Sequence, residues 1–181
     1  MDEIFEAIKR REHCVFKQLF ETYFKKITLF AEYFLLDRDE AEDIAQEIFV
    51  DLWNNAPTLP EIANLKSYLF VQVRNKCLNR LKHLHVEDHY KQWLAEAQAY
   101  AEIPEVEIDP ELLQRVYEVI EELPDQSRLI FKSCVLEGKK YKDVAEEMGI
   151  SVNTVNTQMK RAYKYIRTRL GVSFLIILAV V

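Results

Sequence analysis

Side chains that could bind DNA are gathered near the carboxyl end of the chain. Between residues 151 and 164 stand the short polar and cationic residues Ser151, Asn153, Thr154, Asn156, Thr157, Lys160, Arg161 and Lys164. Amide and guanidinium groups hydrogen-bond to base edges, while hydroxyl and ammonium groups commonly contact phosphates. The segment 152–170 carries five cations and no acidic residue. This composition predicts binding to an anionic polymer, and duplex DNA in particular.

Two helices separated by a tight turn would position these side chains. A short helix over 141–148 would place Ala145 inward, Gly149 would form the turn, and Ser151 would cap a long helix over 152–170. Apolar residues flank the turn at suitable spacing, namely Ile150, Val152 and Val155. This pattern is typical of a helix-turn-helix, whose second helix lies in the major groove of DNA.

A second cationic helix is predicted in the first half of the chain, beginning at Leu65. Its inner side is apolar and consists of Leu65, Leu69, Val73, Cys77, Leu81 and Leu84. Its cations are Lys66, Arg74, Lys76, Arg80 and Lys82, and no acidic residue occurs between Ile62 and Val86. Such one-sided charge again favours an anionic partner.

Four further helices, one of them over 111–123, are expected to build the cores. The stripe Phe16, Leu19, Phe20, Tyr23, Phe24, Ile27, Phe30 and Phe34 predicts a buried helical face over 13–36. Asp39, with Glu42, is expected to cap the next helix, whose outer side holds Asp43, Gln46 and Glu47. Taken alone, that polar side is best interpreted as a solvated surface. Asp125 is expected to cap a helix that runs to Glu137 and ends at Gly138.

Composition favours an all-α fold of two small helical domains joined by an acidic linker. The 181 residues include only three glycines and five prolines, so few turns are encoded. The net charge of −6 is concentrated in residues 84–111, which hold eight acidic residues and one lysine. We expect domains at 1–85 and 111–171, the linker at 86–110, and an apolar tail at 172–181. The linker's charge suits either a flexible spacer or a mimic of nucleic acid.

The same inspection argues against catalysis, cofactors and metal sites. Cys14, Cys77 and Cys134 lie far apart and are expected to be reduced thiols. His85 and His89 lack a third ligand, so no metal site is predicted. The chain shows no nucleophile–base set or phosphate-binding glycine loop, and we expect neither an enzyme nor a small-molecule substrate. The apolar end of the tail is shorter than the ~20 residues of a membrane span, and with no signal peptide a cytoplasmic protein is expected.

Two separated blocks carry a family resemblance. The segments DRDEAEDIAQEIFVDLW (37–53) and LKSYLFVQVRNKCLNRLKH (65–83) resemble region 2 of bacterial RNA polymerase sigma factors of the extracytoplasmic-function (ECF) type. The segment 123–170, beginning LPDQSRLIFKSCVLEGKKYKDVAEEMGIS, is similar to sigma region 4. The resemblance implies a transcription initiation factor that binds core polymerase, directs it to promoters and helps to melt DNA.

The resemblance also implies roles for particular residues. Asp43, Gln46 and Glu47 would contact the clamp helices of the largest polymerase subunit. Asn75 would lie near a flipped base of the minus-ten element, while Arg74, Lys76 and Arg80 would hold phosphates. In the minus-thirty-five element, Asn156, Thr157, Lys160 and Arg161 would contact bases, and Ser151, Thr154 and Lys164 would contact phosphates. Many family members have arginine at the position of Asn156, so a different upstream sequence is expected here.

The resemblance implies an anti-sigma partner as well, and the aromatic-rich first helix and apolar tail are similar to members whose anti-sigma partner is bound to the membrane. The alternative from a different class is a stand-alone helix-turn-helix regulator that binds operators as a dimer. It would need a dimerisation or ligand domain, which the cationic helix beginning at Leu65 does not suggest. The two hypotheses differ in whether the chain binds specific DNA without polymerase.

Overall fold

The structure is a computed structural model, and it describes residues 2–60, 62, 64–83, 110–171 and 174. Helices make up the regular structure of this part of the chain, which contains no strand, so the all-α prediction is confirmed. The elements are α1 (Asp2–Lys9), α2 (His13–Leu35), α3 (Arg38–Asn55), a 3-10 turn (Ala56–Thr58), α4 (Leu65–His83), α6 (Pro110–Glu121), α7 (Asp125–Phe131), a π-helical segment (Lys132–Leu136), α8 (Tyr141–Met148) and α9 (Val152–Leu170).

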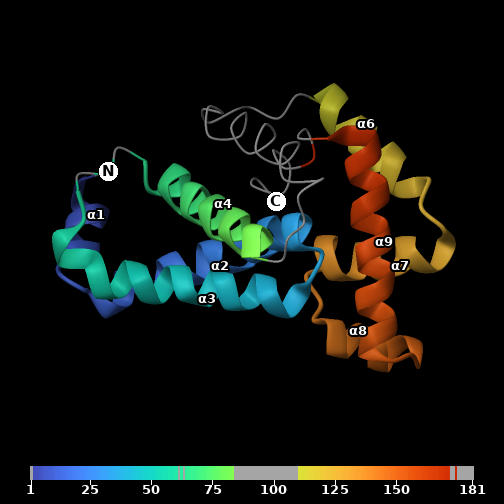
Figure 1. The fold of residues 1–181 in the computed structure, drawn as a ribbon, viewed down its shortest axis with the longest axis horizontal. Helices are drawn as coiled ribbons and strands as arrows, with labels where there is room; N and C mark the ends of the chain where they lie inside the picture. The colour runs from blue at the N-terminus through green and yellow to red at the C-terminus, as the bar shows by residue number, and fades with distance from the viewer. Residues whose placement is uncertain (1, 61, 63, 84–109, 172–173, 175–181) are drawn as a thin grey trace.

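Helices α2, α3 and α4 pack side by side in the first half of the molecule (Figure 1). The predicted inner side of α4 is largely confirmed, because Leu69, Val73, Cys77 and Leu81 are buried. The aromatic stripe of α2 is buried at Phe30 and Phe34, but Phe20 remains 38% exposed. Phe20 stacks on Phe24 at the edge of the bundle, so this part of the expected buried face is partly open to solvent.

The cap of α3 differs from the prediction. Asp37, not Asp39, occupies the N-cap position, and its carboxylate accepts a hydrogen bond from the Glu40 backbone N–H at 3.3 Å. Leu36 ends α2 with a left-handed φ of 54°. This sharp reversal brings Asp37 to the helix start two residues earlier than the local sequence suggested, and Asp39 lies within the first turn.

The helix-turn-helix is formed by α8 and α9 as predicted. Gly149 ends α8 with φ 63°, a left-handed conformation that glycine adopts without a side-chain clash. Ser151 then caps α9, its hydroxyl accepting from the Thr154 N–H at 3.0 Å. Val155 and Ala145 are buried where the two helices meet.

The helix expected over 125–137 is not uniform. Pro124 occupies its N-cap position, while Asp125 is the first helical residue and its carboxylate accepts from Arg128 at 2.6 Å. The α-helix ends at Phe131 and continues as the π-helical segment 132–136. The expected Asp125 cap was therefore wrong, whereas the helix expected to run to Glu137 is helical as far as Leu136.

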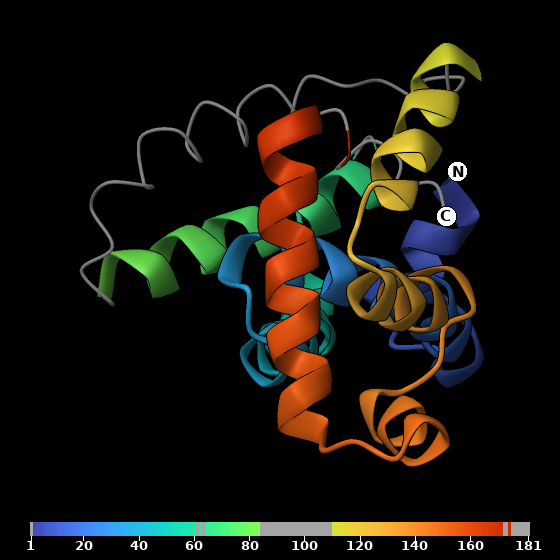
Figure 2. The same ribbon diagram turned by 90° about the vertical axis from the view of Figure 1, so that its right-hand side faces the viewer.

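Helices α1–α4 form one group and helices α6–α9 the other. Helix α9 crosses the end of the α2–α3 pair, so the two groups are in contact (Figures 1 and 2). Tyr33 of α2 meets Tyr163 of α9 with ring centroids 6.2 Å apart, and both residues are completely buried. Tyr33 and Tyr163 therefore belong to one continuous apolar core that spans both groups.

Several predictions fall outside the described residues. They concern His85, His89, Leu84 and most of the linker over 86–110, together with the tail except Phe174. The domain limits 1–85 and 111–171 stay predictions. Among the described residues, no helix has the length and apolar character needed to cross a membrane.

Candidate nucleic-acid interface

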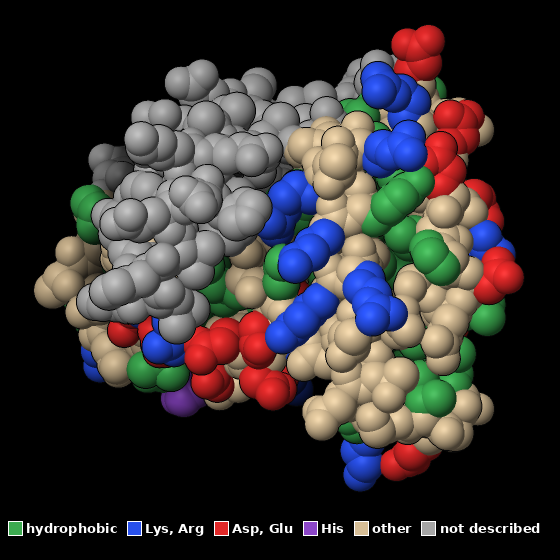
Figure 3. Space-filling view, turned by 45° about the vertical axis from the view of Figure 1, so that its right-hand side comes forward, with side chains coloured by type: hydrophobic (Ala, Val, Ile, Leu, Met, Phe, Trp, Pro, Cys, Tyr) green, Lys and Arg blue, Asp and Glu red, His purple; other side chains and the backbone are tan. Residues whose placement is uncertain are grey.

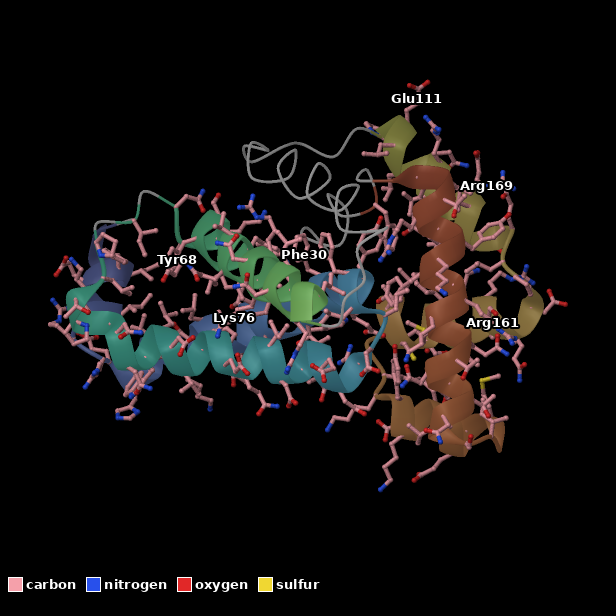
Figure 4. All side chains as sticks on the ribbon, viewed as in Figure 1. Phe30, Tyr68, Lys76, Glu111, Arg161 and Arg169 are labelled. Atoms are coloured by element: carbon pink, nitrogen blue, oxygen red, sulfur yellow. The ribbon has the colours of Figure 1, made fainter. Side chains whose placement is uncertain are left out.

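One side of α9 forms a basic ridge on the surface. Figure 3 shows Lys and Arg side chains gathered in a column, with acidic side chains next to it. Arg161 and Lys164 are exposed, and Arg161 points away from α2–α4 (Figure 4). Because α9 has no acidic residue, these charges face solvent with nothing on their own helix to neutralise them. The ridge can therefore approach a polyanion.

The hydroxyl-bearing residues at the start of α9 also maintain the local helix geometry. The Ser151 and Thr154 hydroxyls lie 2.9 Å apart, and the Ser151 hydroxyl also caps the helix. Thr157 donates to the backbone oxygen of Asn153 at 2.9 Å. Ser151, Asn153 and Thr157 remain exposed, while Thr154 and Asn156 are half-buried. These bonds fix the side chains in defined directions at the expected groove-facing edge.

Lys160 differs from Arg161 and Lys164 because it contacts the other group of helices. Its ammonium lies 3.2 Å from the Asp37 carboxylate. The two residues are far apart in the sequence, so no local pattern indicated this ion pair. Lys160 thus joins a proposed DNA-reading helix to the N-terminus of α3.

On α4, Arg74 and Asn75 form one exposed unit. The Arg74 guanidinium donates from Nε and Nη2 to the Asn75 side-chain oxygen at 3.3 and 3.1 Å. Asn75 is exposed, and Arg74 is partly so. The remaining polar atoms of the Asn75 amide can hydrogen-bond to an unstacked base, because the Watson–Crick edge of a base offers donors and acceptors.

Lys76 and Arg80 of α4 bond to carboxylates of α3. Lys76 lies between the two helices (Figure 4), with its ammonium 2.9 Å from both Glu47 and Asp51. Although burial lowers the pKa of Lys76, the bonds to Asp51 and Glu47 raise it overall above its ordinary value. Arg80 lies 2.7 Å from Glu40. A phosphate would have to compete with these carboxylates for the two cations. The sequence alone did not predict these ion pairs, because they join different helices.

The outward side of α3 is polar and exposed. Asp43, Gln46 and Glu47 follow one another around this side, and Val50 continues it with 56% of its surface exposed. Glu47 remains more than half exposed despite its bond to Lys76. An acidic and amide surface with an apolar residue at its end can bind a basic, hydrogen-bonding partner.

The cysteines and acidic residues do not form a metal site in the described part of the chain. Cys77 and Cys134 are buried free thiols, whereas Cys14 is exposed. Burial, together with the nearby Glu32 carboxylate, raises the pKa of Cys134 to about 12. Burial raises the pKa of Cys77 as well, so these two buried thiols are protonated near neutral pH.

Models of known protein families match both of the sequence blocks that resemble sigma regions. The family model described as "Sigma-70 region 2" matches residues 19–85, and the one described as "Sigma-70, region 4" matches residues 113–166. The two matches together cover well over half of the chain. The first match contains most of α2 and all of α3 and α4, and the second contains the helix-turn-helix.

A curated relative extends this likeness across both regions. The ECF RNA polymerase sigma factor SigX of Bacillus subtilis (strain 168) is 21% identical over 160 residues, which are 84% of this chain and 81% of that protein. The chain belongs to the sigma-70 family and is of its ECF type. This membership supports a role as a sigma factor in promoter-specific transcription.

Proposed function

We propose that this chain binds core RNA polymerase through the outward side of α3, directs the enzyme to specific promoters, and helps to melt the DNA. The observation that carries the proposal is the presence, on one chain, of two cationic helices from different sigma regions and a separate acidic surface. In this proposal residues 1–85 act as region 2 and residues 111–171 as region 4, with the acidic linker between them.

In the proposed complex, Asp43, Gln46 and Glu47 contact the clamp helices of the largest polymerase subunit. Melting of the minus-ten element involves α4. Asn75 binds the extruded base while Arg74, Lys76 and Arg80 hold the backbone, and such capture offsets an unstacking cost of about a few kcal/mol. The ion pairs of Lys76 and Arg80 with α3 hold these cations in place until phosphates displace the carboxylates.

In the proposed region 4 contacts, α9 enters the major groove of the minus-thirty-five element. Asn156, Thr157, Lys160 and Arg161 contact bases, while Ser151, Thr154 and Lys164 hold phosphates. ECF factors usually work with anti-sigma proteins, and we propose such a partner here as well. The chemistry of transcription belongs to the polymerase, and this chain supplies recognition.

Run-off transcription with purified bacterial core polymerase tests the proposal. Discrete start sites should appear on genomic promoter fragments only when this protein is added. The triple variant Asp43→Ala, Gln46→Ala, Glu47→Ala should abolish them and weaken binding to core polymerase. The matched control is Glu111→Ala, Gln114→Ala, Glu118→Ala, which likewise removes two carboxylates and one amide, from the exposed side of α6, and should leave start sites intact.

The rival function makes the opposite prediction. A dimeric helix-turn-helix regulator would protect specific DNA without polymerase and produce no new start sites. A footprint by the protein alone, combined with the absence of transcripts, would therefore contradict the sigma-factor mechanism and favour the regulator.

A further inference from the structure

Gly171 and Phe174, which follow α9, contact α2 in the other group of helices. The Tyr33 hydroxyl donates to the Gly171 backbone oxygen at 2.9 Å. Three residues later, Phe174 is only 2% exposed, and its ring centroid lies 5.9 Å from that of Tyr33 and 6.1 Å from that of Phe131. Phe174 therefore fills a position between α2 and α7.

This attachment is part of a larger contact between the two sigma regions. Arg167 of α9 lies over the Tyr33 ring, 4.5 Å from its centroid. The Tyr141 hydroxyl at the start of α8 donates to Glu32, a carboxylate only 2% exposed that also accepts from Arg38 at 3.1 Å. Burial of aromatic rings supplies most of the stability of such a contact, and the buried polar groups fix its register.

The contact affects the proposed DNA-reading helix directly. With region 4 against α2, the Lys160 ammonium is held 3.2 Å from Asp37. A half-exposed ion pair contributes little stability by itself, so it cannot hold the regions together. The ion pair forms because the aromatic packing around Tyr33 brings the two regions together. It places a carboxylate where a base edge or a phosphate would have to bind Lys160.

We propose that Gly171 and Phe174, which follow α9, form an intramolecular clasp that holds region 4 against α2 in the free chain and keeps Lys160 away from DNA. The inference rests on the proposed role of α9 in DNA binding. Binding of polymerase to region 2 would then compete with the clasp and separate the regions. Phe174 thereby has intramolecular partners in Tyr33 and Phe131.

The variant Phe174→Ala in the full-length chain tests the clasp without polymerase. Binding to a short duplex, measured by fluorescence anisotropy, should tighten on the order of tenfold, because apparent affinity scales with the fraction of competent molecules. Tyr33→Phe retains the ring but removes the bond to Gly171, and it should have a smaller effect in the same direction. The control Tyr117→Ala removes an aromatic ring that is 45% exposed on α6 and should change nothing.

The native cysteines provide an independent measurement. Cys134 lies close enough to Glu32 and Arg38 for their charges to act on its thiol, so it reports on this contact. In Phe174→Ala, alkylation of Cys134, followed by mass spectrometry, should be about tenfold faster. Cys14 should react rapidly in both proteins because it is exposed, and Cys77 should stay protected in the core of region 2.

The outcomes separate the clasp from simpler roles. Unchanged duplex affinity and unchanged Cys134 alkylation would overturn the clasp, as would a loss of duplex binding, which would make Phe174 only a core residue of region 4. Run-off transcription by the wild-type protein tests the sigma function separately. Start sites without any effect of Phe174→Ala on DNA binding would thus refute the clasp and leave the proposed function standing.

Discussion

At the scale of single residues, Asn156 is the side chain that the proposed minus-thirty-five contacts make most direct for promoter choice. It lies on the first turns of α9, half-buried, beside the exposed Thr157. A side-chain amide pairs with adenine through one donor and one acceptor, whereas arginine offers two donors and pairs with guanine. The proposed minus-thirty-five sequence therefore depends on this residue.

Replacing Asn156 with arginine should change the preferred base from adenine to guanine at one position of the minus-thirty-five element. The change in discrimination should be about 1–3 kcal/mol. Selection of binding sequences from a randomised upstream segment, with the protein bound to core polymerase, measures it. Thr168→Arg adds the same charge near the other end of α9, where the side chain is exposed, and should leave base preference unchanged. The same selected sequences for wild type and Asn156→Arg would exclude Asn156 from base reading.

At the scale of elements, α9 combines a cap, an apolar side and a basic ridge. Ser151 fixes the start of the helix, while Met159, Ala162 and Ile166 are buried on the side that packs on its neighbours. The residues left facing outward include Arg161 and Lys164. The helix thus presents cations to solvent because its apolar residues determine which side is buried.

Lys164→Ala should reduce the salt dependence of DNA binding by the polymerase complex. If Lys164 holds one phosphate, the slope of log affinity against log salt concentration should become about 0.9 less steep. Anisotropy titrations of a promoter duplex at several salt concentrations give this slope. Lys17→Ala removes an exposed cation from α2 and serves as the control. A slope identical to that of wild type would assign Lys164 to the solvated surface instead.

At the scale of the whole molecule, a buried carboxylate lies where the two regions meet. Burial raises the pKa of Glu32, although Arg38 and the Tyr141 hydroxyl oppose this effect by stabilising the charged form. Tyr141 also lies under the Arg38 guanidinium, 5.5 Å from ring centroid to Cζ. The carboxylate that binds Tyr141 across this contact therefore has a pKa above its ordinary value.

The free energy of unfolding should depend on pH through Glu32. Because its pKa is raised in the folded protein, the folded state holds a proton that the unfolded state releases. Its contribution to stability is thus complete below the ordinary pKa of 4.5 and declines as pH rises through the folded value. Urea unfolding at several pH values should show wild type losing stability relative to Glu32→Gln as pH rises. A relative gain with rising pH would mean that Arg38 dominates and the pKa is lowered.

Local features of the sequence were sufficient for most helices and for the helix-turn-helix. The periodicity of apolar residues and the positions of Gly149 and Ser151 predicted α8 and α9 with the bounds that the structure shows. Such signals act between residues three or four apart, so they can be recognised without knowledge of the fold. The same holds for the two blocks that resemble sigma regions 2 and 4.

Tertiary structure alone decided which charges meet. Lys76 with Glu47 and Asp51, Lys160 with Asp37, and Tyr141 with Glu32 join residues on different helices. No local spacing encodes these pairs, because they depend on how whole helices are rotated and placed against one another. The position of Phe174 between Tyr33 and Phe131 arises in the same way. The sequence by itself thus determined the helices and the family, whereas the packing of α9 on α2 decided which proposed DNA contacts are exposed in the free chain.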